Sequence, residues 1–437
     1  MDRLPLELLQ RVLTYLDFQA LRNATLSCRS IFDAFKGAEE IITGQILFRQ
    51  ISYDVLPEAI LVNKSRHLGK SSVGERIEFA KAHLYHRELP PVKWSLADAL
   101  PLARFHQMVN YLATQAAEDA LQRQPRLLAT GESPTCAEIS RFERALYRFQ
   151  LYCNVRGRSG PAEELDDLFF DHLATWENEQ LACIYDHLVR AVSIPYNYLV
   201  ERDITDHESD YAQQILFEGI EKIYQLVQPF SGYTQWHALL SRGEDRHDEP
   251  FFLPGFLALG LERSANPMIP PYVSLSKMHP EDKDFVTNRP FYEDPDPGPV
   301  SMWEWIYRDR LPGQLVANPF MRVHRQWAFP FWDHSRLEAA GLLRDPELPG
   351  PWCVSDLELE AFRSAHRLEL LEETQRDRTK LWEAGRWGWY GNKDSSQAKS
   401  RIREPKHEEP TLYGQPQSLE KAKDFLKLVA DLMKKTD

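Results

Sequence analysis

The sequence predicts a mainly α-helical protein with three short N-terminal helices, an irregular α-helical domain, and a Pro/Trp-rich, loop-dominated wrap. Two observations support this fold class. Apolar residues recur at i, i+3, i+4 and i+7 through much of the chain, which is the period of a helix with one buried face. Between residues 250 and 351 stand 16 of the 29 prolines, and proline at that density interrupts helices.

The first predicted helix begins near Pro5, because a proline in the first turn loses no intrahelical hydrogen bond. Leu9, Val12, Leu13 and Leu16 then form one apolar stripe over about three turns. Such a stripe must be covered either by the rest of this chain or by another chain.

Two further short helices are expected before residue 37. Asp17 is a suitable N-cap for the second helix. Because an isolated core of fewer than about 40 residues is rarely sufficient, the three helices need additional cover. Their apolar faces contain Leu21, Ala24, Thr25 and Cys28 in the second helix and Ile31, Phe32 and Phe35 in the third.

The segment Leu4 to Lys36 resembles an F-box. The similarity rests on the Leu-Pro start at residue 4, Glu7, Val12-Leu13, Leu16, Asp17, Leu21, Cys28-Arg29 and Phe32. Members of this family dock these helices onto a Skp-type adaptor, which links them to a cullin-RING ubiquitin ligase. The resemblance therefore implies ten residues on the adaptor face or in the small core behind it: Leu4, Pro5, Leu9, Val12, Leu13, Leu16, Leu21, Ala24, Cys28 and Phe32.

Composition limits the partners and the compartment. The chain has 437 residues, enough for two or three domains, and 52 basic against 65 acidic side chains give a net charge of −13. Nucleic acid and anionic membranes are therefore poor partners. Five scattered cysteines without a C-x-x-C pair are typical of reduced thiols in a cytoplasmic or nuclear protein. We expect neither a cofactor nor a metal.

Helical patterns continue beyond the F-box-like segment. Residues 39–51 keep helical spacing, whereas 63–76 are polar and predict a loop or linker. From 96 to about 240 apolar stripes recur without a fixed repeat, and Thr135 with Glu138 forms a capping box. The expected domains are an F-box at 1–50, a connecting region at 51–95, a helical body at 96–390 with its Pro/Trp-rich segment at 250–352, a disordered linker at 391–417 and an amphipathic helix at 418–437.

The Pro/Trp-rich segment is expected to be ordered, because its tryptophans need burial. Short helices are predicted at Met302–Arg308 and His334–Ala340, the second closed by Gly341. Trp327 to Leu343 is similar to a segment of fungal F-box proteins. A long helix is expected after Ser355, followed by an aromatic tail with Trp382, Trp387, Trp389 and Tyr390, and a terminal helix with Leu419, Ala422, Phe425 or Leu426, Val429 and Leu432 aligned.

Groups that could carry chemistry are better explained as surface features. The acidic runs at 206–210 and 244–249 have no predictable scaffold for a metal. Asp294 and Asp296 have the spacing of a calcium loop but lack its flanking helices and distal ligand. His83 and His86 share a helix face but have no third ligand nearby.

The leading hypothesis is a non-enzymatic substrate receptor of a Skp-cullin-F-box ubiquitin ligase, whose body binds a target protein. One alternative is an adaptor-bound protein that acts outside any ligase. Another is an all-α enzyme whose N-terminal helical hairpin only imitates an F-box and belongs to a larger core.

Overall fold

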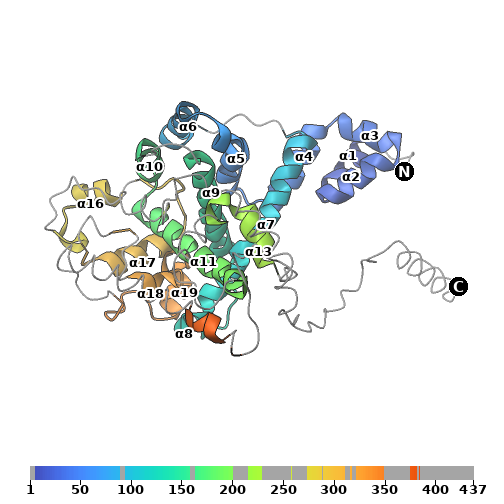
Figure 1. Cartoon of the computed structure of the whole chain (residues 1–437). Coiled ribbons are helices and arrows are strands. Elements are labelled where there is room, and N and C mark those ends of the chain that lie inside the picture. Colours follow the sequence, from blue (N-terminus) through green and yellow to red (C-terminus); the bar gives the residue numbers. More distant parts are fainter. Residues whose placement is uncertain are drawn as a thin grey trace, which may run out of the picture.

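The computed structural model describes residues 5–88, 94–157, 163–199, 215–228, 257, 273–287, 289–310, 315–316, 321–348, 375–380 and 383. Within these ranges the regular secondary structure is helical and no strand occurs (Figure 1). The mainly α fold class is therefore confirmed.

Four short helices pack together at one end of the molecule (Figure 1). Their shared core includes Leu13, Phe18, Leu21 and Phe35, all buried. The helix expected over 39–51 is present as the fourth of them. These helices are α1 (Leu6–Thr14), α2 (Phe18–Ser27), α3 (Arg29–Lys36) and α4 (Glu39–Gln50). We call α1–α3 the N-terminal unit.

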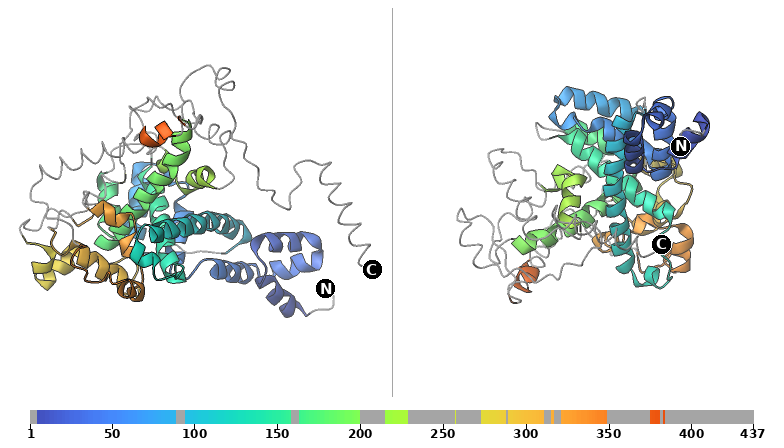
Figure 2. Two further views of the ribbon diagram at one scale, coloured as in Figure 1. Left: turned by 90° about the horizontal axis from the view of Figure 1, so that it is seen from below. Right: turned by 90° about the vertical axis from the view of Figure 1, so that its right-hand side faces the viewer.

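Helix α7 (Leu96–Gln122) joins the N-terminal end of the molecule to the body (Figure 2). Its 27 residues span about 40 Å at 1.5 Å per residue. The first turns contact α4, and later turns contact α9 (Cys136–Arg156) and α13 (Ile220–Val227). Helix α4 is thus shared between the N-terminal unit and the body.

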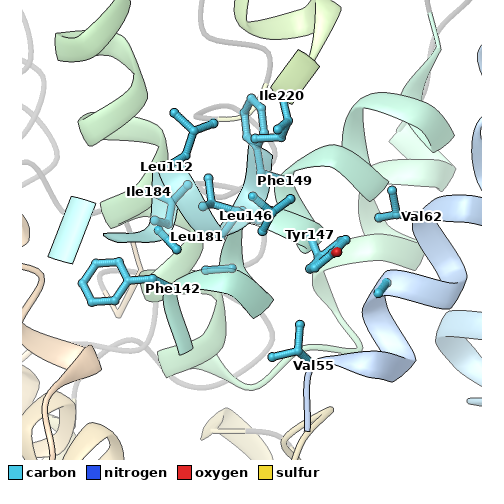
Figure 3. Packing of buried hydrophobic residues seen from close by; sticks show 14 of the residues in the cluster. Val55, Val62, Leu112, Phe142, Leu146, Tyr147, Phe149, Leu181, Ile184 and Ile220 are labelled. Atoms are coloured by element: carbon cyan, nitrogen blue, oxygen red, sulfur yellow. The ribbon is translucent and has the colours of Figure 1, made fainter. Parts of the chain in front are cut away.

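Helix α9 is the centre of the body. The predicted capping box at its start is confirmed, because Thr135 accepts a hydrogen bond from the Glu138 N–H and the Glu138 carboxylate accepts one from the Thr135 N–H. Phe142 and Leu146 of α9 pack beside Leu181 of α11 (Thr175–Leu199) in an apolar core (Figure 3). The neighbours of α9 are α5 (Leu56–Ser65), α6 (Val73–Ala80), α7, α10 (Glu163–Phe170) and α11.

The described parts of the proline-rich segment, chiefly 273–287, 289–310 and 321–348, lie against this body, and most of its other residues lie outside the described ranges. Trp303 and Trp332 are fully buried, and Trp327 nearly so. Gly341 has a φ of +64°, as expected of a residue that closes a helix. The described short helices of this segment are α16 (Pro280–Thr287), α17 (Gly298–Tyr307), α18 (Arg322–Arg325) and α19 (His334–Ala339). Helices α17 and α19 lie close to the two predicted helices, whereas α16 and α18 were not predicted from the sequence.

Buried arginines of α9 hold the wrap in place. The Arg141 guanidinium lies 2.8 Å from the Asp294 carboxylate and 2.7 Å from that of Asp333. The Arg144 guanidinium lies 2.9 Å from Asp294 and 2.6 Å from Asp54, which precedes α5. Asp294 therefore pairs with the guanidinium groups of both arginines.

One sequence prediction was wrong. Residues 63–76 are not a loop, because α5 extends to Ser65, a short 3-10 turn occupies Leu68–Lys70, and α6 begins at Val73. Ser72 and Glu75 form a capping box at the start of α6. This motif overrides the two glycines on which the loop prediction relied.

Several other predictions fall outside the described residues. They are Leu4, the acidic runs at 206–210 and 244–249, the helix after Ser355, the aromatic tail, the linker at 391–417 and the helix at 418–437.

Candidate adaptor-binding surface

Contacts from α3 and α4 fix the position of α1. The Arg49 guanidinium of α4 donates to the carbonyl oxygens of Thr14 (2.8 Å) and Leu16 (2.7 Å) at the C-terminal end of α1. These carbonyls have no intrahelical partner, and the helix dipole favours a cation there. The Gln10 amide donates to the Ala34 carbonyl oxygen of α3 at 3.0 Å. The helix is thereby held in one rotation about its axis.

The turn between α1 and α2 is also defined by a side chain. Asp17 accepts a hydrogen bond from the Ala20 N–H at 2.6 Å, which confirms the predicted N-cap. Helix α2 therefore begins one residue after Asp17, and Phe18 turns into the core.

The structure divides the ten predicted adaptor-binding residues by burial. A buried side chain stabilises the unit, whereas an exposed one can contact another chain without unfolding the helices. The buried group is Leu9, Leu13 and Leu21, the exposed group is Pro5, Val12, Cys28 and Phe32, the half-buried group is Leu16 and Ala24, and Leu4 lies outside the described residues.

Large apolar side chains are concentrated on the exposed surface near the N-terminus. Nine of the fourteen such side chains in the described part of the chain lie within residues 6–53. Exposed large apolar side chains that gather in one part of a chain are typical of an interaction site. The nine residues, which we call the N-terminal apolar surface, are Leu6, Leu8, Val12, Tyr15, Leu26, Phe32, Ile41, Phe48 and Tyr53.

Part of this surface was missed from the sequence. Leu8, Val12 and Tyr15 stand at i, i+4 and i+7 on α1 and are 49%, 46% and 68% exposed. We call these three residues the α1 outer stripe. The stripe predicted from the sequence, Leu9, Val12, Leu13 and Leu16, contains Val12 but omits Leu8 and Tyr15, and only its Leu9 and Leu13 are buried. The available signal was that α1 carries apolar residues on two faces, more than one buried face needs.

A charged contact joins the N-terminal unit to α7. Glu39 accepts from Lys36 at 2.7 Å and from the Leu96 N–H at 2.9 Å. Burial raises the pKa of the Glu39 carboxyl, but these two hydrogen bonds outweigh it, so the pKa lies below its ordinary value. Glu39 is therefore ionised at neutral pH and ties α3, α4 and α7 together.

A buried polar cluster lies between α7 and α9. The Asn110 amide donates to the Glu143 carboxylate at 2.8 Å, and the His106 ring lies 3.7 Å from it. Burial raises the pKa of Glu143 to about 7 and lowers the pKa of His106 to about 4. Both side chains are less than a tenth exposed. His106 and Glu143 are therefore shielded between the two helices, whereas Asn110 is exposed at the edge of the cluster.

The remaining sequence candidates show no metal arrangement. Within the described ranges no group of three or more His, Cys, Asp or Glu side chains could hold a metal ion. The His83 ring packs on Phe79 with centroids 4.5 Å apart, and His86 is exposed beside Tyr85.

Comparison with known proteins gives one finding. A family model described as F-box domain matches residues 1–39, which comprise the N-terminal unit and the first residue of α4. No curated protein and no solved structure matches the chain significantly. An F-box implies binding of a Skp-type adaptor in the context of a ubiquitin ligase. The N-terminal segment is therefore an F-box domain, and the chain is consistent with an F-box protein.

Proposed function

We propose that the chain is the substrate-receptor subunit of a Skp-cullin-F-box ubiquitin ligase. In this proposal the N-terminal apolar surface binds the Skp-type adaptor, the adaptor binds a cullin, and the body binds a target protein. The observation that carries the proposal is the concentration of exposed apolar side chains near the N-terminus, where six of the nine lie on the segment that matches the F-box.

Burial of this surface supplies a plausible binding energy. Complete burial of one large aliphatic side chain contributes roughly 1.5–3 kcal/mol. Two or three anchors of this kind, surrounded by near-neutral contacts, suffice for a specific interface. Val12 and Phe32 are the predicted residues best placed to act as anchors, being 46% and 43% exposed.

A receptor also needs a second surface for its target. The body has an open cleft of about 500 Å³ between α8 (Pro125–Leu128) and α19, lined by Arg126, Thr130, Arg336 and Ala339 among others. Helix α8 follows the C-terminal end of α7, whereas α4 packs at the N-terminal end of α7. We infer that the cleft is the candidate target surface, about one α7 length away from the adaptor.

The two alternatives predict different partners. An adaptor-bound protein acting outside a ligase requires no cullin, and an enzyme requires a substrate that the cleft converts. F-box proteins are typically non-enzymatic recruiters, which favours the receptor. No helix in the described part of the chain is long and apolar enough to cross a membrane. We propose the cytoplasm or the nucleus as the compartment.

Affinity purification of the full chain tests the proposal. We expect adaptor and cullin to co-purify with the wild type, and both to be lost from the double variant Val12→Asp/Phe32→Asp. The matched control is Gln107→Asp/Gln115→Asp, which adds the same charge at two exposed positions of α7. Adaptor without cullin in the wild-type sample would favour action outside a ligase.

A separate pair of variants tests whether the cleft binds the target. Ala339→Trp fills it from an exposed position of α19, whereas Glu338→Trp adds the same ring outside the lining residues. The proposal expects Ala339→Trp to lose target proteins while it retains adaptor and cullin. Equal target recovery from both variants would place the target surface elsewhere.

The domain limits stay a proposal. We propose to move the F-box limit from the expected residue 50 to residue 37, so that the body begins with α4, because Ile46 and Leu47 of α4 are completely buried and α4 packs on α7. The exposed Ile41, Phe48 and Tyr53 then extend the adaptor surface onto the first part of the body. Removal of residues 1–37 should therefore leave a cooperative unfolding transition, and removal of 1–51 should lower its midpoint.

A further inference from the structure

The α1 outer stripe is an exposed apolar row along one face of a helix. Leu8, Val12 and Tyr15 follow one another on successive turns of α1, so a second helix can pack along them with its own i, i+4 rows. Among the described residues no neighbour buries these three side chains, which are 49%, 46% and 68% exposed.

The last predicted helix of the same chain carries an apolar stripe to which no cover is assigned. Residues 418–437 lie outside the described ranges, and their sequence aligns Leu426 and Val429 with three other apolar positions on one predicted helical face. A helix of this segment's length spans about 30 Å. That length exceeds the three turns of α1, so the stripe can be covered completely.

The chain is long enough for the two segments to meet. Glu383 is the last described residue, and residues 384–417 separate it from the predicted terminal helix. A connection of this length reaches up to about 110 Å when extended. The body is crossed by α7, which spans about 40 Å. No part of the N-terminal unit is therefore beyond its reach.

We propose that residues 418–437 bind the α1 outer stripe when no adaptor is present, so that the chain masks its own F-box. The regulatory meaning rests on the proposed function, since the stripe belongs to the surface assigned to the adaptor. Tethering gives an effective concentration on the order of 1 mM, so a contact with a Kd of about 100 µM occupies the stripe roughly nine-tenths of the time. The apparent Kd for the adaptor then rises roughly tenfold, because only one-tenth of the chains are competent to bind.

The test uses the full chain and two matched double variants. Leu426→Ser/Val429→Ser removes two apolar side chains from the predicted stripe. Lys427→Ser/Asp431→Ser introduces the same residues on the polar face and leaves the net charge unchanged. Both variants lower helix propensity by similar amounts, so that a difference between them reports the apolar face.

Two measurements separate the inference from the proposed function. The first is amide hydrogen exchange of residues 8–15 in the chain alone, which requires no adaptor. We expect faster exchange in the stripe variant, and wild-type exchange in the control. The second is titration with purified Skp-type adaptor, for which the stripe variant should bind roughly tenfold more tightly than the wild type.

Each result of the two measurements tests a different part of the proposal. Equal exchange of residues 8–15 in all three chains would overturn the inference, whatever the adaptor does. Altered exchange with no adaptor binding to any of the chains would retain the self-docking and overturn the adaptor assignment. Altered exchange with equal adaptor affinities would restrict the docking to a part of the surface that the adaptor does not use, and would overturn masking.

Discussion

The N-terminal unit and the region around α9 distribute their side chains in opposite ways. The N-terminal unit leaves Val12, Tyr15 and Phe32 in water, whereas α9 buries the guanidinium groups of Arg141 and Arg148 almost completely. Apolar side chains in water weaken a lone chain and strengthen a complex. Buried charges cost desolvation, and their carboxylate partners accept only one placement of the wrap. The N-terminal unit is thus suited to binding a partner, and the region around α9 is suited to maintaining one conformation.

The largest expected effect comes from removing one member of the buried ion network. Arg141→Ala leaves the Asp294 and Asp333 carboxylates without their main cation and should lower the free energy of unfolding by about 3–5 kcal/mol. The control is Arg289→Ala, which removes an exposed ion pair with Glu293 worth at most about 1 kcal/mol. Urea unfolding of both variants measures the difference. Similar losses of unfolding free energy in the two variants would mean that the buried ion pairs contribute no more to stability than the exposed pair does.

The second prediction separates core from surface within α1. Leu13→Ala should cost about 2–5 kcal/mol, because Leu13 is 2% exposed. Val12→Ala, one residue away, should change stability by less than about 0.5 kcal/mol. Hydrogen exchange of the N-terminal unit reports both values. If Val12→Ala were as damaging as Leu13→Ala, the outer stripe would be part of the core.

The third prediction concerns the enclosed polar cluster. Folding raises the pKa of Glu143 from 4.5 to about 7, so the folded chain binds the proton more tightly than the unfolded chain does. This group therefore lowers stability as the pH rises from about 4.5 to 7, by up to roughly 3 kcal/mol. Glu143→Gln removes this dependence and keeps the oxygen that accepts from Asn110.

The measurement is the stability difference between Glu143→Gln and the wild type at pH 5 and pH 8. We expect the free energy of unfolding of Glu143→Gln, relative to that of the wild type, to increase as the pH rises from 5 to 8. Burial lowers the pKa of His106 to about 4, so the contribution of His106 to stability rises with pH up to about 6.5, opposite in sign to that of Glu143. A difference that does not change between pH 5 and pH 8 would contradict the raised pKa.

The smallest expected effect is on a helix cap. Asp17→Ala removes the acceptor for the Ala20 N–H and should cost about 1 kcal/mol in the N-terminal unit. Asp33→Ala, in an exposed pair with Arg29, should cost less than half of that. Hydrogen exchange of α2 distinguishes the two. A null effect of Asp17→Ala would show that packing on α3 and α4 alone positions α2.

Features with a local cause could be predicted from the sequence. The Asp17 cap, the Thr135 capping box and the Gly341 helix end each depend on a few adjacent residues, and all three are present. The loop predicted over 63–76 failed for a local reason too, because glycines were weighted above the Ser72 capping box.

Features with a long-range cause could not be predicted. The pairing of Arg141 with Asp294 and Asp333 joins positions more than 150 residues apart, and no sequence period indicates it. The burial of Leu9 and Leu13 and the exposure of Val12 likewise depend on where α3 and α4 pack, which the stripe in α1 does not determine.

Titration of purified Skp-type adaptor into the full chain tests the central claim most directly. We predict that the adaptor binds saturably to the wild type and to Gln107→Asp/Gln115→Asp. We expect a loss of at least about thirtyfold for Val12→Asp/Phe32→Asp, because one anchor side chain is worth about 2 kcal/mol. Thermal unfolding of the same samples should be unchanged. Undiminished affinity of a folded Val12→Asp/Phe32→Asp variant would contradict the assignment of the N-terminal apolar surface.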